Sequence, residues 1–112
     1  MPAADRPWAV YLLECQGERT YLGISPDPQQ RFEAHVAGRG SFFTRLNRPT
    51  RIACVVWFAC RRHAAVMERK LKSVDVASRR EWLERWQLRA QDAPVDFEAA
   101  EFAFDRWKER RG

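Results

Sequence analysis

A nine-residue apolar run from Ile52 to Cys60, enclosed by Arg51 and Arg61, constrains the fold of this chain more than any other feature. A helix that crosses a bilayer needs about 20 apolar residues, so this run is too short to span a membrane. Its residues are apolar on both faces of an extended strand, which is typical of a strand inside a sheet. We therefore expect residues 52–60 to form the central strand.

Two further apolar segments near the N-terminus predict a β-hairpin. Trp8 to Cys15 is rich in apolar and aromatic residues, and Thr20 to Ile24 resumes this character. The polar residues 16–19 between them have the composition of a turn. The first strand of the hairpin is expected to be long and well buried.

Capping residues place a helix directly after the hairpin. Asp27 can cap its start, with Pro28 at the first helical position and Gln30 at the third. Residues 38–41, Gly-Arg-Gly-Ser, should end the helix. An irregular basic loop is then expected to run to about Arg51.

Two pairs of residues divide the surface of this helix. Phe32 and Val36 are four positions apart and can face the core. Arg31 and His35, also four apart, share a neighbouring face. Two polar side chains are thereby expected side by side at the edge of the core.

Three later segments have helical patterns. Residues 61–75 carry an apolar stripe at helical spacing, formed by Ala64, Met67, Leu71 and Val74, with Glu68 just beside it. Ser78 and Glu81 resemble a capping box for a further helix, and Phe97 begins the last amphipathic helix. The whole pattern predicts an α+β fold, with a three-stranded, mainly antiparallel sheet flanked by helices and extra C-terminal helices. Residues 1–112 should form a single domain.

The distribution of charge favours a polyanionic partner. The net charge is +5, and no acidic residue lies between Ala34 and Met67. The arginines in that stretch are Arg39, Arg45, Arg48, Arg51, Arg61 and Arg62. Such a surface attracts nucleic acid, although an ordinary solvated basic face explains the charge alone equally well.

The remaining composition indicates the compartment. Cys15, Cys54 and Cys60 form no Cys-x-x-Cys pair and lie in apolar segments, which is typical of reduced core cysteines. The N-terminus has no basic segment leading into an apolar stretch, so no secretory signal is expected. We expect a cytoplasmic protein that does not associate with membranes. The sequence does not fix the oligomeric state, and a monomer is the starting expectation.

The ordered spacing of five residues resembles the GIY-YIG nuclease family. Tyr11 lies in Ala-Val-Tyr and Tyr21 begins Tyr-Leu-Gly, one in each strand of the hairpin. Arg31 follows ten residues later and His35 four residues after that. Glu68, followed by Leu-Lys at positions 71 and 72, looks like the single metal-binding glutamate of the family. The resemblance covers about residues 8–80, and residues 81–112 form a helical extension that matches no pattern.

The resemblance implies a metal-dependent endonuclease that acts on DNA. Glu68 would bind Mg²⁺ or Mn²⁺, Arg31 would contact a phosphate, and Tyr11, Tyr21 and His35 would transfer protons and position water. Tyr11 is favoured as the base, with His35 assisting. The expected contacts with the DNA backbone are Arg39, Thr44, Arg45, Arg48, Arg51 and Lys72. A preference for DNA structure over sequence, in repair or processing, follows from the lack of a separate recognition domain.

Departures from the family pattern keep other functions open. Ile24 stands where some family nucleases carry a lysine, and no asparagine follows Asn47. A catalytically weak or inactive nucleic-acid-binding module is therefore the alternative. A third reading is an adaptor whose Trp-rich C-terminal helices dock a partner. Taken singly, each of the five site residues is better explained by packing or solvation, and only their joint spacing favours a nuclease site.

Overall fold

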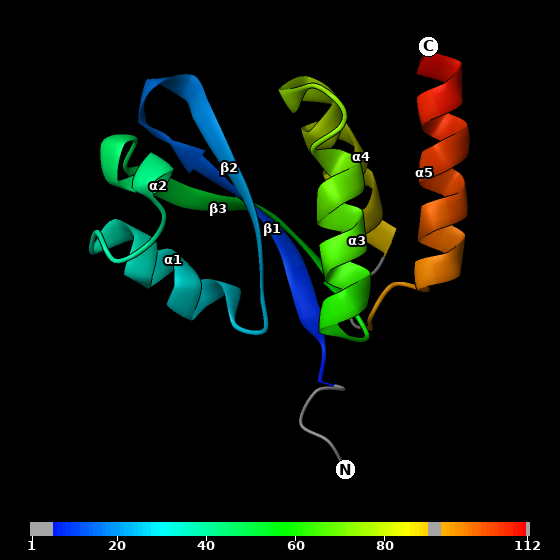
Figure 1. Cartoon of the computed structure of the whole chain (residues 1–112), viewed down its shortest axis with the longest axis horizontal. Coiled ribbons are helices and arrows are strands. Elements are labelled where there is room, and N and C mark those ends of the chain that lie inside the picture. The colour runs from blue at the N-terminus through cyan, green and yellow to red at the C-terminus, as the bar shows by residue number, and fades with distance from the viewer. Residues whose placement is uncertain (1–5, 90–92, 112) are drawn as a thin grey trace.

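The computed structural model describes residues 6–89 and 93–111. In chain order the elements are β1 (Trp8–Cys15), the 3-10 helix η2 (Gln16–Glu18), β2 (Arg19–Ser25), α1 (Pro28–Val36), α2 (Phe42–Leu46), β3 (Pro49–Phe58), α3 (Arg61–Leu71), α4 (Val76–Arg89) and α5 (Phe97–Arg111). The strands form one antiparallel sheet, and two helices, α4 and α5, follow α3 (Figure 1). The predicted α+β fold is confirmed.

The order of strands in the sheet is β2-β1-β3, so the prediction of a central β3 is wrong. The first strand is central, and β3 is an edge strand whose outer side is covered. The Gln87 side chain on α4 accepts a hydrogen bond from the backbone N–H of Val55 at 2.6 Å. Beyond α4, the backbone N–H of Val95 donates to the carbonyl of Trp57 at 2.7 Å. These hydrogen bonds satisfy the open edge. The strand is apolar on both faces because Cys54, Val56 and Phe58 pack into one apolar cluster, while Ile52 and Val55 pack against another.

A β-bulge in β3 determines which of its side chains face α1. Leu12 pairs with Cys54, but Leu13 pairs with Ile52, so Ala53 is the extra residue. The inserted residue shifts the alternation of side chains along the strand. Ile52 and Val55 consequently both pack on the face of the sheet that carries Tyr11.

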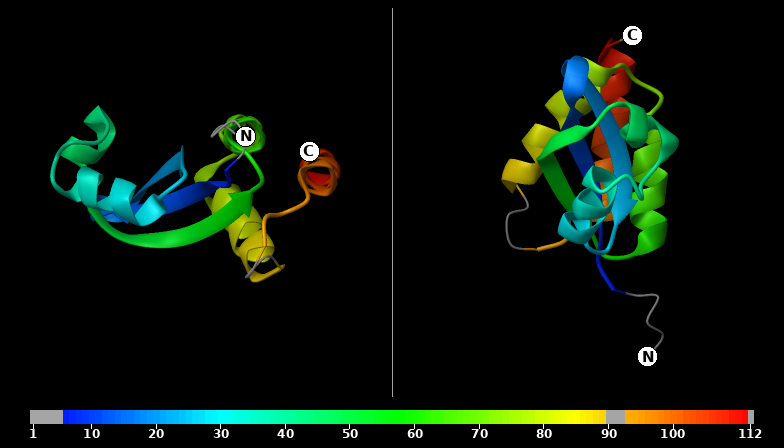
Figure 2. Two further views of the ribbon diagram at one scale, coloured as in Figure 1. Left: turned by 90° about the horizontal axis from the view of Figure 1, so that it is seen from below. Right: turned by 90° about the vertical axis from the view of Figure 1, so that its left-hand side faces the viewer.

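The sheet separates two apolar clusters of unequal size. The smaller cluster contains Tyr11, Leu13 and Cys15, with Phe32 of α1 packed against it. The larger cluster packs the other side of the sheet against α3, α4 and α5; its members include Val10, Leu12, Val56, Phe58, Met67, Leu71, Trp82, Leu83 and Phe104. Figures 1 and 2 show α1 and α2 at one end of the curved sheet and the last three helices at the other. The strand β1 runs between these two groups.

The predicted start of α1 is confirmed, whereas the boundary between α3 and α4 differs from the expectation. The Asp27 side chain caps α1 by accepting a hydrogen bond from the Gln30 N–H at 3.0 Å. Helix α3 ends at Leu71, before Asp75. Asp75 instead caps α4, since its carboxylate accepts from the Ser78 N–H at 2.7 Å. The predicted capping box of Ser78 and Glu81 is therefore wrong, because both residues lie inside α4.

Membrane insertion has no support in the described residues. Among residues 6–89 and 93–111, no helix combines the length and the apolar character that a membrane span requires.

The three cysteines are free thiols, and two of them, Cys15 and Cys54, are buried as expected.

Replacing Gln87 tests the cover of the β3 edge. Gln87→Ala should leave the Val55 N–H without its acceptor and lower the free energy of unfolding by about 1 kcal/mol. Urea denaturation followed by tryptophan fluorescence measures this loss. Gln87→Glu is the matched control, because it keeps an acceptor oxygen and should retain most of the stability. Equal losses in both variants would contradict a stabilising role for this hydrogen bond.

Candidate active site

Tyr11 is held against a glycine on the neighbouring strand. It pairs with Gly23 in the register of β1 and β2, and its side chain is only 1% exposed. A Cβ atom at position 23 would lie 2.6 Å from the Tyr11 hydroxyl oxygen. The glycine of the Tyr-Leu-Gly triplet is thus required because the phenol lies directly over it.

His35 is the buried polar residue of α1. It is 1% exposed, whereas Val36 is 39% exposed, so the prediction that Val36 faces the core is wrong. The Tyr11 hydroxyl and His35 Nε2 are 3.2 Å apart and form a hydrogen bond. The helix therefore turns His35, together with Phe32, towards the sheet. The hydroxyl of a buried tyrosine needs such a partner.

The segment after α1, which was expected to be an irregular loop, contains the short helix α2. Thr44 of this helix contacts the His35 ring on the side away from Tyr11. Ser41 caps α2 by accepting a hydrogen bond from the Thr44 N–H at 3.2 Å. Thr44 Oγ1 is 2.7 Å from His35 Nδ1 and donates to the Ser41 carbonyl at 3.0 Å. A Cβ atom on Gly40 would lie 2.0 Å from His35 Nδ1, so only glycine lets the chain pass so close to the ring.

The contacts of Thr44 favour one arrangement of the protons on the histidine. The single hydroxyl proton of Thr44 is used in its bond to Ser41, so His35 Nδ1 carries a proton and donates to Thr44. In the neutral ring, Nε2 then has a free lone pair and accepts from the Tyr11 hydroxyl. The result is a directed hydrogen-bond chain from Tyr11 through His35 and Thr44 to the backbone.

Thr44 has a different place from the one predicted. We expected it to contact nucleic acid, but its side chain is 0% exposed behind His35. Its hydroxyl is instead taken up by contacts with His35 and the Ser41 carbonyl. Its contact with His35 was not predicted, although Ser41, three residues before Thr44, has the spacing of a helix cap that indicates α2.

Tyr21 completes an aromatic layer over the site. Its ring centroid lies 4.9 Å from that of His35 and 6.4 Å from that of Tyr11. On its other side Phe43 of α2 stacks on it at 6.2 Å. The two tyrosines and the histidine, which come from β1, β2 and α1, are therefore in mutual contact.

Arg31 and Glu68 have opposite effects on the pKa of the buried Tyr11 phenol. Burial raises the pKa of Tyr11 to about 12, and the nearby Tyr21 and Glu68 act in the same direction. The guanidinium of Arg31 opposes this rise in the pKa of Tyr11. Burial, assisted by Arg31, lowers the pKa of His35 below its usual value of 6.5. At neutral pH the site therefore holds a neutral phenol beside a neutral imidazole.

Glu68 is the carboxylate whose charge acts on Tyr11. It lies on α3, its side chain is 23% exposed, and it pairs with Lys72 one turn later at 3.5 Å. Within residues 6–89 and 93–111, no three His, Cys, Asp or Glu side chains form a ready-made metal cage. One partly exposed carboxylate fits Mg²⁺, which keeps several of its waters and takes substrate phosphate as a further ligand. The donor set at Glu68 is thus compatible with the expected metal ion.

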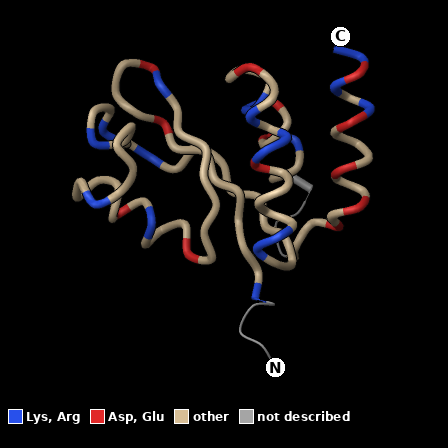
Figure 3. Tube along the Cα trace, in the orientation of Figure 1, with Lys and Arg blue, Asp and Glu red and all other residues tan. Residues whose placement is uncertain are grey.

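The predicted DNA-contacting arginines divide into two groups. Arg39, Arg45 and Arg48 are exposed on and around α2, at the same end of the sheet as α1 (Figure 3). Arg51 differs, because it pairs with Glu14, which also binds Arg80 of α4 at 2.9 Å. These partners lie on the face of the sheet opposite Tyr11. Arg51 therefore belongs to a structural ion pair away from the candidate site, contrary to the expectation.

The three-stranded sheet and α1 bring Tyr11, Tyr21 and His35 into contact, and the charges of Arg31 and Glu68 both act on Tyr11, in a nuclease-like fold. The chain belongs to the GIY-YIG family, since the sequence model of the GIY-YIG catalytic domain matches residues 7–80. Residues 81–112 lie outside this match, in agreement with the expected extent of the resemblance. The family assignment implies, in general terms, a nucleic-acid substrate.

Relatives of similar size come from several bacteria. A UPF0213 protein of Cupriavidus necator is 35% identical over 78 residues, which cover 70% of this chain and 85% of the relative. A UPF0213 protein of Xanthomonas campestris is 35% identical over 94 residues, which cover 83% of this chain and 92% of the relative. The solution NMR structure of a UPF0213 protein of Bacillus halodurans matches with a TM-score of 0.44 and 26% identity, over 70% of this chain and 83% of that one.

The lowered pKa of His35 predicts a pH-dependent stability. The buried ring must be neutral in the folded chain, whereas an unfolded histidine takes up a proton near pH 6.5. The contribution of His35 is therefore complete above about pH 6.5 and is lost as the pH falls below it. The Tm of the protein should drop between pH 7.5 and pH 5, and the drop should be smaller in His35→Gln. Equal drops in both proteins would contradict the buried neutral histidine; His63 is present in both and cancels.

Proposed function

We propose that this chain is a metal-dependent endonuclease that hydrolyses DNA phosphodiester bonds, selecting the structure of its substrate in repair or processing. The observation that carries the proposal is the hydrogen-bond chain of Tyr11, His35 and Thr44, which lies beside Arg31 and Glu68. A buried, prearranged proton path next to one cationic and one anionic group is costly to maintain for packing alone. It is the arrangement that phosphodiester hydrolysis requires.

The hydrogen-bond chain supplies a route for the proton of the attacking water. A phenol with a pKa of about 12 is almost entirely protonated at neutral pH, so free phenolate is scarce. His35 removes this difficulty, because its Nε2 accepts the phenolic proton while the Tyr11 oxygen takes a proton from water. Thr44 holds the ring in the tautomer that makes Nε2 the acceptor. Tyr11 is thus the base, His35 assists it, and Tyr21 packs over both.

The phosphate is neutralised by the charged groups around Tyr11. Glu68 would hold Mg²⁺ or Mn²⁺, an ion that stabilises negative charge on the scissile phosphate when it is bound. Arg31 binds a non-bridging oxygen through its planar guanidinium. Lys72, paired with Glu68, is exposed enough to contact a neighbouring phosphate. These contacts recognise phosphate and carry no sequence information.

Attachment to DNA depends on the arginines of the α2 region. Arg39, Arg45 and Arg48 offer exposed positive charge near the site, with no acidic residue in residues 34–67 to oppose them. They are suited to the phosphate backbone and provide little apparatus for reading bases. The enzyme is therefore selective for the shape of the DNA more than for its sequence.

Replacing Glu68 and Arg31 separates catalysis from attachment. Glu68→Ala should reduce metal-dependent cleavage of branched or nicked DNA at least on the order of 10²-fold, while affinity is kept or increases, because one negative charge is lost beside the phosphate. Arg31→Ala should lower both cleavage and affinity, since its guanidinium also contacts phosphate in the ground state. Glu33→Ala on α1 is the control for loss of an exposed carboxylate and should change neither.

Circular dichroism of each variant completes this experiment. Glu68 lies beside the apolar stripe of α3, so Glu68→Ala should keep the wild-type spectrum and Tm. The metal assignment would have to be abandoned if folded Glu68→Ala cleaved DNA with wild-type rate and metal dependence. Loss of the fold would make Glu68 a structural residue.

The salt dependence of binding tests the division of the arginines. With about four phosphate contacts, among them Arg39, Arg45 and Arg48, the slope of log affinity against log salt should be roughly −3 to −4 on duplex DNA. Arg45→Ala should make this slope shallower by about one, whereas Arg51→Ala should leave it unchanged, because Arg51 already pairs with Glu14. Fluorescence anisotropy of labelled DNA measures both slopes. A slope near zero in the wild type would remove nucleic acid from the proposal.

The alternative function is a nucleic-acid-binding module without useful catalysis. The observation that favours it is the position of Ile24, which packs partly buried against the larger apolar cluster, where some family members carry a lysine. A phosphate or water contact supplied by that lysine is then missing. Salt-dependent binding without cleavage of nicked, branched or single-stranded DNA, in either Mg²⁺ or Mn²⁺, would favour this function.

A further inference from the structure

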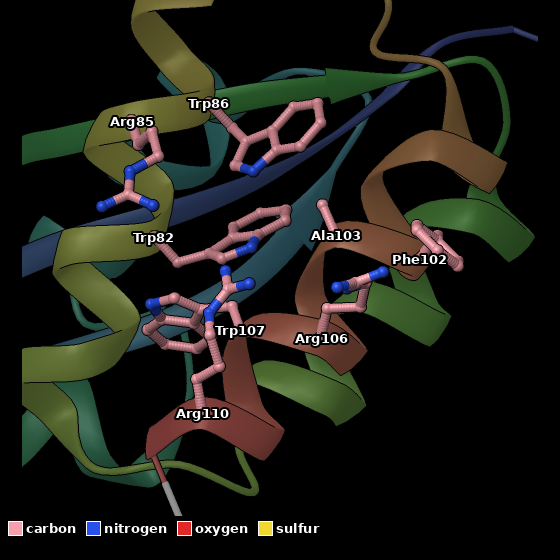
Figure 4. A pocket seen from close by; sticks show the side chains of 8 residues that line it. All are labelled: Trp82, Arg85, Trp86, Phe102, Ala103, Arg106, Trp107 and Arg110. Carbon is pink, nitrogen blue, oxygen red and sulfur yellow. The ribbon is translucent and has the colours of Figure 1, made fainter.

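A crevice between α4 and α5 lies outside the candidate active site. It has a volume of about 330 Å³, near the lower end of the roughly 300–1,000 Å³ that is common for ligand pockets. Tryptophans from both helices line it, and arginines surround them (Figure 4). Its position among the C-terminal helices places it at the end of the sheet opposite α1 and α2 (Figure 1).

The charge around the crevice is positive. Arg85, Arg106 and Arg110 line it, and no acidic residue does among the described residues. Glu81, one turn before Arg85 on α4, pairs with Arg85 at 3.5 Å and with Arg111 at 3.2 Å. The crevice is therefore suited to an anionic ligand.

A buried donor in the crevice needs an acceptor. Trp82 is only 2% exposed, and within the described part of the chain its indole Nε1–H has no hydrogen-bond partner. Figure 4 shows the Arg110 side chain extending from α5 towards this indole. Because Arg110 is long and exposed, it can swing aside to pair with an anion and give a ligand oxygen access to the indole N–H. An unsatisfied buried donor is costly, so such a ligand would remove a penalty.

The apolar part of the crevice consists mainly of aromatic side chains. The indoles of Trp82 and Trp86 stack with centroids 5.4 Å apart and an angle of 24° between their planes. At the rim Phe102 is 64% exposed, with the Arg106 guanidinium 5.6 Å from its ring centroid. Aromatic faces beside arginines bind nucleic-acid bases by stacking, with little dependence on base identity.

We propose that this crevice binds one nucleotide unit, with its base on the aromatic residues and its phosphate between Arg106 and Arg110. A base next to a phosphate occurs in a single nucleic-acid strand and in a free mononucleotide, and both satisfy the same contacts. We favour the strand as the source of this nucleotide unit. The inference then rests on the proposed function, and the crevice provides a second contact for a single-stranded part of the substrate.

The indole signal of Trp82 reports occupation of the crevice directly. In a ¹⁵N-correlated NMR spectrum, the Trp82 signal is identified by its loss in Trp82→Phe. Titration with ten-nucleotide oligothymidylate, in EDTA to prevent cleavage, should shift this signal as the N–H gains an acceptor. Thymidine monophosphate should need higher concentrations if the source is a strand, and equal or lower ones if it is a free nucleotide. An unmoved Trp82 signal with both ligands would overturn the proposal.

Arginine variants provide the matched comparison. Arg110→Ala should weaken oligothymidylate binding by about five-fold, the effect of one exposed charge-assisted contact. Arg62→Ala removes the same charge from the exposed surface of α3 and should have a smaller effect. Equal effects in the two variants would overturn the inference. Cleavage that depends on Glu68 is measured separately, so failure of the crevice and failure of the nuclease proposal give different results.

Discussion

The contact between the Tyr11 phenol and the His35 ring is the interaction on which the arrangement of this protein depends. Both side chains are only 1% exposed, so each needs the other as a hydrogen-bond partner. That requirement fixes how α1 turns against the sheet. The backbone at Gly23 also has to approach the Tyr11 phenol closely, and the backbone at Gly40 the His35 ring. Both approaches are possible because glycine has no Cβ atom. Burial of one hydroxyl thereby couples two strands, a helix and the following loop.

Electrostatics divide the protein into regions with different tasks. Around Tyr11 the positive charge of Arg31 and the negative charge of Glu68 oppose each other, and the buried pair remains neutral. On the other face of the sheet, Glu14 ties β1 to Arg51 and Arg80, an ion pair network that stabilises packing. The same residue type, arginine, therefore opposes the rise in the pKa of a buried phenol at position 31 and forms a structural ion pair at position 51.

Much of the fold could be predicted because local rules decide it. The bounds of β1 and the Asp27 cap of α1 follow from short-range pattern and side-chain chemistry. Predictions failed where a distant segment provides the partner. The edge position of β3 depends on cover by Gln87 from α4, and Thr44 is buried because α2 folds back on His35. No property of those short sequences alone distinguishes these outcomes.

The sequence by itself determined the family and the alternation of strands and helices, because these follow from residue spacing along the chain. It also gave five candidates for the site: Tyr11, Tyr21, Arg31, His35 and Glu68. The tertiary structure alone decided that Tyr11, His35 and Thr44 form a hydrogen-bonded chain, and that Arg51 is separate from the other arginines. Within the described residues, it also revealed that the Trp82 indole N–H between α4 and α5 has no hydrogen-bond partner. These properties depend on burial and on distances between segments far apart in sequence, which no local pattern encodes.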